Sequence, residues 1–256
     1  MPATRPSSTT GLRAGTGLSY ISRAATLVVH KDLRLFVIVP LLINLVLFFI
    51  LTSVLMQQFE SVVAAILGWL PGWMDFLSWL IWSLLAATVL VIYGYSFSII
   101  TNIIAAPFYG LLAERAEVLL TGKAAPAEPL RHMIPRTLGR EMQKLGYFIS
   151  RGLAVLLLGL LLSFIPLVNL LVPVISILWG AWTMAIQYAD YPADNHQLAF
   201  AELRKRLSQQ RSHTYSFGGL VLLGTMVPVL NIFIMPIAVV AGTCYWTDRL
   251  TLVQRP

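Results

Sequence analysis

Ile-Pro-Leu-Val-Asn-Leu-Leu-Val-Pro, at residues 165–173, decides how this chain folds, because it interrupts a long apolar run that carries no charged side chain. A similar motif, Val-Pro-Val-Leu-Asn-Ile-Phe-Ile-Met-Pro, interrupts a second charge-free run at residues 227–236. Proline cannot continue the hydrogen-bond ladder of a helix, so each motif predicts that one helix ends and another begins. Each interrupted run is therefore expected to form a pair of helices.

Four stretches of the chain lack Asp, Glu, Lys and Arg: residues 35–59, 76–113, 152–189 and 212–247. A hydrocarbon core about 30 Å thick takes roughly 20 helical residues to cross, so these runs predict helices embedded in a membrane. The composition agrees, because 57% of the residues are hydrophobic and only 11% are charged. A soluble domain carries roughly 25% charged residues. The sequence therefore predicts an all-α integral membrane protein.

The positions of the charges predict how the first two runs are threaded. All 18 basic residues lie outside the four runs, and the only charged residues between the first run and the second are Glu60 and Asp75. Because basic loops stay in the cytoplasm, two crossings are predicted, over about residues 35–56 and 79–104, with both termini cytoplasmic. The turn outside the membrane is expected near Pro71, inside an aromatic belt of Trp69, Trp73, Trp79 and Trp82.

The third and fourth runs begin and end beside basic residues, so both ends of each run are expected on the cytoplasmic side. Their arms are short, and apolar segments of about 10–14 residues are typically re-entrant. Two re-entrant helical hairpins are therefore predicted, over about 152–189 and 217–247, with second arms that begin near Pro173 and Pro236. Six complete crossings are the alternative. A backbone that turns at bilayer depth needs protein or water around it, which favours a transporter and a homo-oligomer.

The remaining segments are predicted to be cytoplasmic. Residues 1–18 are polar and predict a disordered tail, residues 251–256 form a second tail, and residues 19–250 form one helical membrane domain. The second crossing helix is expected to continue through residues 105–122 and to end at Gly122. A short helix is expected over 199–211, with a Glu202–Arg206 pair.

Arg136, Arg140 and Lys144 recur every four residues, which predicts one basic face on a helix. Two interpretations remain open: this face rests on anionic lipid headgroups, or it is a solvated extension of the third run. Asp190 and Asp194 are expected to cap a helix at the membrane edge.

Signals for catalysis are weak. Gly122-Lys123-Ala124 lacks the glycine spacing and the following Ser or Thr of a phosphate-binding loop, and no His-Glu-x-x-His motif is present. The formal net charge of +7 is explained by basic cytoplasmic loops, and no nucleic-acid recognition motif accompanies it. We therefore expect a protein that is not an enzyme and that has no cofactor, no metal and no nucleic-acid partner.

One arrangement suits an anion. Arg34 stands at the cytoplasmic start of the first crossing, where free backbone amides and the helix dipole add positive potential. Broken helices inside the membrane would direct further helix N-termini at an anionic substrate.

Several segments resemble the CysZ sulfate permease family. They are Leu-Arg-Leu-Phe-Val-Ile-Val-Pro-Leu-Leu-Ile-Asn at 33–44, Ile-Ala-Ala-Pro-Phe-Tyr-Gly-Leu-Leu-Ala-Glu at 104–114, Ala-Ile-Gln-Tyr-Ala-Asp-Tyr-Pro-Ala-Asp-Asn-His at 185–196, and the run at 225–236. The resemblance covers about residues 17–250. It implies an oligomeric sulfate importer of the bacterial inner membrane that supplies cysteine biosynthesis, with two long crossing helices and two partly inserted hairpins.

The family's sulfate site resembles a Gly-apolar-Arg-Arg turn before the first crossing, and the matching residues here are Asp32-Leu33-Arg34-Leu35. The resemblance implies that the Arg34 side chain binds sulfate, with Leu33 and Leu35 contributing backbone amides. Asp32 replaces the glycine and Leu35 the second arginine, so an anion would meet one carboxylate more and one guanidinium fewer. Candidates for the pore or for the hairpin tips are Asn44, Glu114, Asn169, Pro173, Asn231 and Pro236. A less selective anion channel and a non-transporting membrane scaffold are the alternative functions.

Overall fold

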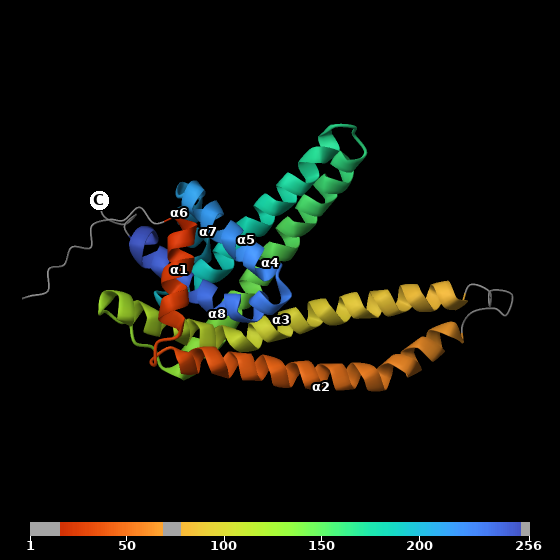
Figure 1. Cartoon of the computed structure of the whole chain (residues 1–256), viewed down its shortest axis with the longest axis horizontal. Helices are drawn as coiled ribbons and strands as arrows, with labels where there is room; N and C mark the ends of the chain where they lie inside the picture. The colour runs from red at the N-terminus through yellow and green to blue at the C-terminus, as the bar shows by residue number, and fades with distance from the viewer. Residues whose placement is uncertain (1–15, 69–77, 252–256) are drawn as a thin grey trace, which may run out of the picture. The chain divides into compact units, whose positions relative to one another are not determined.

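The computed structural model describes residues 16–68 and 78–251, and these residues form helices without any strand. The predicted outer turn near Pro71, with Trp69 and Trp73, lies outside the described residues, as does most of the predicted N-terminal tail. The helices in chain order are α1 Gly17–Val28, α2 Arg34–Leu67, α3 Ser78–Thr121, α4 Leu130–Ser163, α5 Leu171–Asn195, α6 Phe200–Gln209, α7 Arg211–Thr225 and α8 Pro228–Tyr245. Figure 1 shows them along the chain.

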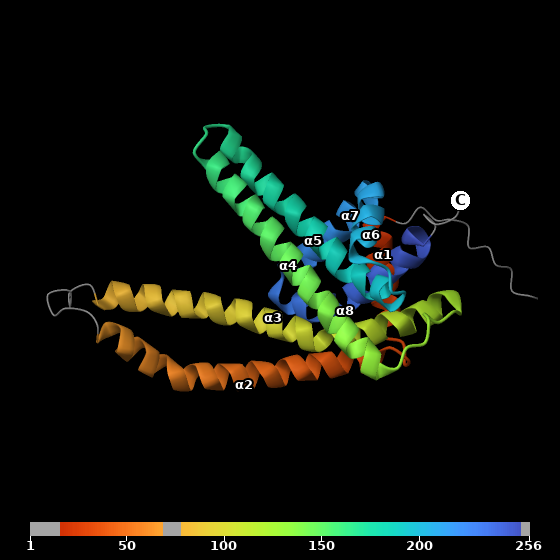
Figure 2. The same ribbon diagram turned by 180° about the vertical axis from the view of Figure 1, so that it is seen from behind.

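The chain divides into two compact units, one of residues 38–108 and one that combines the segments before and after it. The first unit consists of most of α2 and of α3, which run antiparallel side by side in both views (Figures 1 and 2). Thr52 and Tyr93 share a hydrogen bond of 2.6 Å between their hydroxyl oxygens, and the rings of Phe48 and Phe97 meet edge to face with centroids 6.0 Å apart. Polar and aromatic contacts therefore hold the two helices together.

Both crossings predicted from the sequence fall within these helices, and the helices are longer than the predicted spans. Segments Arg34–Ala65 and Trp82–Thr121 are long and apolar enough to cross a membrane. The prediction that the second helix continues to Gly122 is confirmed, because α3 ends at Thr121. Gly122 follows with φ of +70°, a conformation that favours glycine because it has no Cβ.

In the second unit, α4 and α5 form an antiparallel hairpin, whose two arms lie side by side in both views (Figures 1 and 2). The helix break predicted at residues 165–173 is confirmed, since α4 ends at Ser163 and α5 begins at Leu171 after a 3₁₀ turn at Val168–Leu170. The predicted basic helix is continuous with the first arm, because α4 begins at Leu130. Segments Leu130–Ser163 and Val168–Asn195 also have the length and composition of membrane spans.

The fourth run is also broken, but at a different residue from the one predicted. We expected the second arm to begin near Pro236, whereas α7 ends at Thr225 and α8 begins at Pro228. Pro228 occupies the first turn of α8, where its fixed φ and missing amide proton are tolerated. Pro236 and Asn231 therefore lie inside α8 and not at the tip of the hairpin.

The core of this unit lies where α5 packs against α7 and α8, and α1 covers α7 and α8. Small residues allow these helices to approach closely, as is common in membrane proteins. A Cβ atom on Gly218 of α7 would overlap the Ala181 carbonyl oxygen of α5, and one on Gly242 of α8 would overlap that of Tyr188.

The sequence predicts a tail up to residue 18 and no separate helix after it, whereas the structure has helix α1 at Gly17–Val28. Gly17, Tyr20 and Ala24 are buried on one side of it. The Gly17 amide donates to the Ser216 hydroxyl oxygen at 3.1 Å, which joins the start of α1 to α7. The three-to-four-residue spacing of these small and aromatic side chains is the signal that identifies the helix.

Candidate functional site

The turn between α1 and α2 places Arg34 at the first position of the long helix α2. Its side chain is exposed, and no hydrogen bond or ion pair to it is found among the described residues. The amides of Leu33 and Arg34 both donate to the His30 carbonyl oxygen, at 3.0 and 3.1 Å. The amide of Leu35 has no backbone acceptor within the described part of the chain. Arg34 and the Leu35 amide are thus among the groups of this turn that are open to an anion, as is the exposed Lys31.

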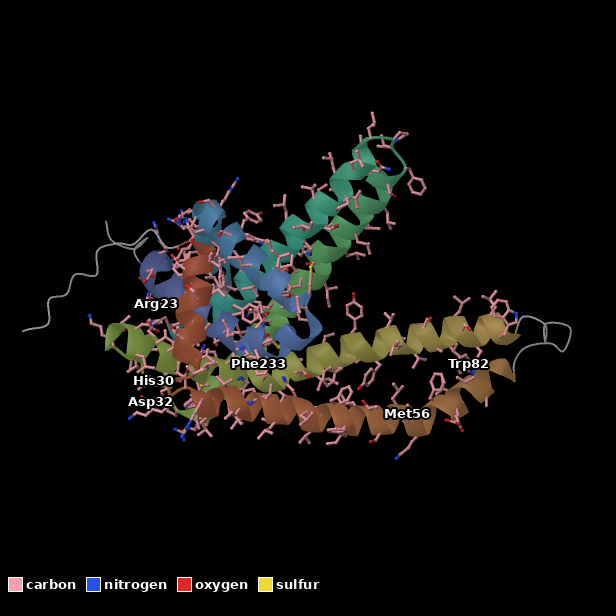
Figure 3. The ribbon with its side chains drawn as sticks, viewed as in Figure 1. Arg23, His30, Asp32, Met56, Trp82 and Phe233 are labelled. Carbon is pink, nitrogen blue, oxygen red and sulfur yellow. The ribbon has the colours of Figure 1, made fainter. Side chains whose placement is uncertain are left out.

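Two neighbours shape this turn. The Leu33 side chain is fully buried and anchors the start of α2, whereas the Leu35 side chain is exposed. His30 and Asp32 lie together just before α2 (Figure 3), with His30 Nδ1 at 3.4 Å from the Asp32 carboxylate. Both of these side chains are exposed. An anion that binds Arg34 therefore meets a carboxylate two residues away, which weakens the attraction through like-charge repulsion.

A second polar site lies between α4 and α5, where charged side chains are buried. Arg140 donates to Asp190 through Nε at 3.0 Å and through Nη2 at 2.7 Å. Lys144 Nζ lies 2.6 Å from Glu141 and 3.3 Å from the second oxygen of Asp190. Lys144 Nζ also stands 4.7 Å from the centre of the Tyr191 ring. Only 1% of the Lys144 side chain and 1% of the Asp190 side chain are exposed.

The ion pairs of Arg140 and Lys144 with Asp190 belong to a ladder of charges between α4 and α5, which extends one helical turn further. Arg136 pairs with Asp194, and its Nη2 lies 2.8 Å from Glu128. The Thr137 hydroxyl donates to Asp194 at 3.0 Å. Buried charges are tolerated when each is paired and hydrogen-bonded, and this condition is met at every step of the ladder.

These contacts correct two predictions. The basic face of Arg136, Arg140 and Lys144 neither rests on headgroups nor projects into solvent, because it covers the carboxylates of α5. Asp190 and Asp194 do not cap a helix, because both lie within α5 and pair with α4. The missed signal was complementary spacing: cations four residues apart on one helix match carboxylates four residues apart on the next.

The segments at 104–114 and 185–196 meet in this region. The rings of Tyr109 and Tyr191 stand edge to face with centroids 5.6 Å apart. Asn195 Nδ2 donates to the Gly110 carbonyl oxygen at 2.7 Å, and His196 Nε2 lies 2.9 Å from the Glu117 carboxylate. The end of α3 is therefore fixed to the end of α5 by polar contacts.

The other candidate residues are dispersed. Asn44 lies on α2 with a buried Oδ1 that has no hydrogen-bond partner in the described part of the chain. Asn169 and Pro173 are exposed at the tip of the α4–α5 hairpin, and Pro236 is buried within α8. The side chain of Asn231 is not among those described. Glu114 is half-buried on α3.

None of the hydrogen bonds and ion pairs among the described residues joins these candidates to Arg34. Three or more His, Cys, Asp or Glu side chains that could hold a metal ion do not come together anywhere in residues 16–68 and 78–251.

Comparison with known proteins gives consistent matches over most of the chain. A family model described as sulfate transporter CysZ/etoposide-induced protein 2.4 matches residues 20–236. A protein of Pseudomonas fluorescens named sulfate transporter CysZ is 44% identical over 235 residues, which cover 90% of this chain and 92% of that protein. A protein of the same name from Salmonella typhimurium is 41% identical over 246 residues, which cover 94% and 95% of the two chains.

Proposed function

This chain belongs to the family of sulfate transporter CysZ and etoposide-induced protein 2.4, and we propose that it imports sulfate across the bacterial inner membrane. The observation that carries the proposal is the identity of 41–44% to sulfate transporters over nearly their whole length. Sulfate that enters by this route would supply sulfur assimilation and cysteine biosynthesis.

We place the first contact with sulfate at the start of α2. The Arg34 guanidinium can donate two parallel hydrogen bonds to an oxyanion, and the Leu35 amide adds a third donor. The N-terminal end of a helix stabilises negative charge through its free amides and its dipole. The Leu33 amide is not available to sulfate, because it already donates to the His30 carbonyl oxygen. Leu33 instead anchors the start of α2 through its buried side chain.

The same proposal includes the arrangement in the membrane. Helices α2 and α3 cross it, the α4–α5 and α7–α8 hairpins enter from the cytoplasmic side and turn back, and both termini are cytoplasmic. Two observations support this. The charges of α4 end at Arg151, so the apolar part of this arm, residues 152–163, is about 18 Å long and shorter than a bilayer core of about 30 Å. Helices α7 and α8 have only 15 and 18 residues.

Turns inside a bilayer need protein or water around them, so we further propose that several copies of the chain enclose the sulfate path. Asn44, Asn169, Pro173 and Glu114 are the residues that we assign to this path or to the hairpin tips. The buried Asn44 Oδ1 supports a polar partner from water or from a second copy, since an unbonded polar atom in an apolar helix is costly.

Uptake of labelled sulfate into sealed vesicles that contain the purified full chain tests the function. We expect accumulation above that of protein-free vesicles, and sulfate uptake at the protein-free rate would contradict the proposal. Competition with thiosulfate, sulfite, molybdate and phosphate distinguishes a sulfate transporter from a less selective anion channel, because only the channel would be slowed equally by all four.

A further inference from the structure

A groove on the α4–α5 hairpin consists of two adjoining hollows. One has a volume of about 490 Å³ and is lined by Trp179, Trp182 and Tyr215, among others. The other has a volume of about 350 Å³ and follows the two arms toward the tip of the hairpin. Val155 and Trp179 line both hollows, so the two hollows lie next to each other.

The apolar part of the groove has the length of one lipid leaflet. Along α4 it extends from Gly152 to Ser163, which is about 18 Å at 1.5 Å per residue. Half of a hydrocarbon core is about 15 Å deep. The wall consists mainly of apolar side chains and small residues, such as Gly159 and Ser176. This part of the groove therefore fits an acyl chain.

The other end of the groove is polar and basic. Arg211 and Ser208 line it, and Arg211 is exposed. Arg204 lies one helical turn before Ser208 on α6, with its guanidinium carbon 4.6 Å from the centre of the Tyr147 ring. Tyr147 in turn accepts a hydrogen bond of 3.1 Å from Trp182 Nε1, which places Arg204 beside the groove wall.

This basic end has no carboxylate to balance it among the described residues. The nearby Glu202 pairs with Lys205 and Arg206, and within residues 16–68 and 78–251 no ion pair joins a carboxylate to Arg204 or Arg211. The Arg204 Nε is buried without a hydrogen-bond acceptor in the described part of the chain. Arg211 donates through Nε to the Ser208 carbonyl oxygen at 3.2 Å, which leaves its other guanidinium donors open.

We propose that this groove binds one anionic phospholipid, with its phosphate at Arg204 and Arg211 and an acyl chain along α4 and α5. Trp and Tyr side chains are typical of the level where headgroups meet hydrocarbon, and Trp179, Trp182 and Tyr215 lie between the basic and the apolar ends. The unbalanced positive charge selects an anionic over a zwitterionic headgroup. The bound lipid would fill the open side of a hairpin whose two arms leave a hollow between them.

Native mass spectrometry of the purified full chain tests this, with phosphatidylglycerol and phosphatidylcholine of identical acyl chains as probes. We expect the wild type to bind phosphatidylglycerol more tightly than phosphatidylcholine. In the double variant Arg204→Gln/Arg211→Gln, the affinity for phosphatidylglycerol is expected to fall about tenfold, to that for phosphatidylcholine. Lys205→Gln is the matched control, because Lys205 lies on the same helix but is exposed and stands 3.9 Å from the Glu202 carboxylate, whereas Arg204 stacks on Tyr147 beside the groove. Val155→Trp fills both hollows and is expected to weaken both lipids.

A second measurement uses the folded wild-type chain. Phosphatidylglycerol with brominated acyl chains is expected to quench tryptophan fluorescence, and the quenched fraction is expected to fall in Trp179→Phe. Equal binding of the two lipids by the wild type, or unchanged phosphatidylglycerol binding in the double arginine variant, would overturn the proposal. Displacement by an equal concentration of inorganic sulfate would assign the basic end to a free oxyanion. A change in subunit number in Val155→Trp without loss of lipid would assign the groove to a second copy of the chain.

Discussion

Arg140 and Asp190 face each other across the α4–α5 hairpin and share two short hydrogen bonds, with 9% and 1% of their side chains exposed. The pair is one step of a ladder, because Arg136 and Asp194 meet one turn away with the same antiparallel spacing. Lys144 adds a second cation to Asp190. The register of the two helices is therefore fixed by charge at the end of the hairpin opposite its tip.

Removal of the shared carboxylate is expected to destabilise the protein strongly. Asp190→Asn leaves Arg140 and Lys144 without their common counter-charge, and a buried charge that loses its partner costs about 3–5 kcal/mol. Thermal unfolding in detergent, followed by circular dichroism, measures the change.

Asp248→Asn is the matched control for that substitution. Asp248 pairs with Arg23 at 3.4 Å, and both side chains are more than a third exposed. Exposed pairs contribute about 0–1 kcal/mol, so the control is expected to unfold close to the wild-type temperature. An Asp190→Asn protein that is as stable as the control would show that the ladder does not hold the hairpin in register.

The sequence predicted the positions of the apolar helices well, because charge-free runs and prolines depend on local chemistry. The break at residues 165–173 and the helix end before Gly122 are examples. It failed where a residue's environment is set by a distant segment. Nothing local to Arg136, Arg140 and Lys144 separates a lipid-facing stripe from one that covers carboxylates of another helix.

The prediction that the second arm begins near Pro236 was wrong for a different reason. Pro228 and Pro236 lie on either side of Asn231, and either proline can begin a helix. The packing of α7 against α8 favours the start at Pro228, because Ile234 of α8 lies beside Gly224 of α7. A Cβ atom on Gly224 would lie only 2.7 Å from the Ile234 side chain. For the site, the sequence indicated Arg34, but it could not reveal that the Leu33 amide is already bonded to His30.

Two adjacent glycines of α7 are expected to respond in opposite ways to alanine. In Gly218→Ala the new methyl group overlaps the Ala181 backbone, and such overpacking costs about 1–3 kcal/mol or more. In Gly219→Ala the methyl group lies 3.9 Å from the Ala181 Cβ, so the higher helix propensity of alanine stabilises by up to about 1 kcal/mol. Thermal unfolding of the two variants measures both changes, and equal effects would contradict the close packing of α5 on α7.

The tip of the α4–α5 hairpin is expected to be inaccessible from outside the cell. In a Cys244→Ala background, Asn169→Cys is predicted to react with a membrane-permeant maleimide and not with an impermeant one added externally. Gln58→Cys lies in the C-terminal part of α2, which the proposed orientation places toward the outside, so it is the control and should react with both reagents. External labelling of residue 169 by the impermeant reagent would favour six complete crossings.

The residues around Arg34 are expected to limit sulfate affinity. The double change Asp32→Gly and Leu35→Arg removes a repelling carboxylate and adds a guanidinium, and one hydrogen bond to a charged group contributes about 1.5–3 kcal/mol. Isothermal titration with sulfate is therefore expected to show binding at least about tenfold tighter than in the wild type. Affinity that is unchanged or lower would place the anion elsewhere.

The most direct test of sulfate recognition at α2 compares initial rates of labelled sulfate uptake in vesicles that contain Arg34→Gln or Lys31→Gln. Both substitutions remove one exposed positive charge from the same turn, so a general effect of surface potential would lower both rates equally. We predict that Arg34→Gln reduces uptake at low sulfate by about tenfold or more, whereas Lys31→Gln stays near the wild-type rate. Equal rates in the two variants would contradict this role of Arg34.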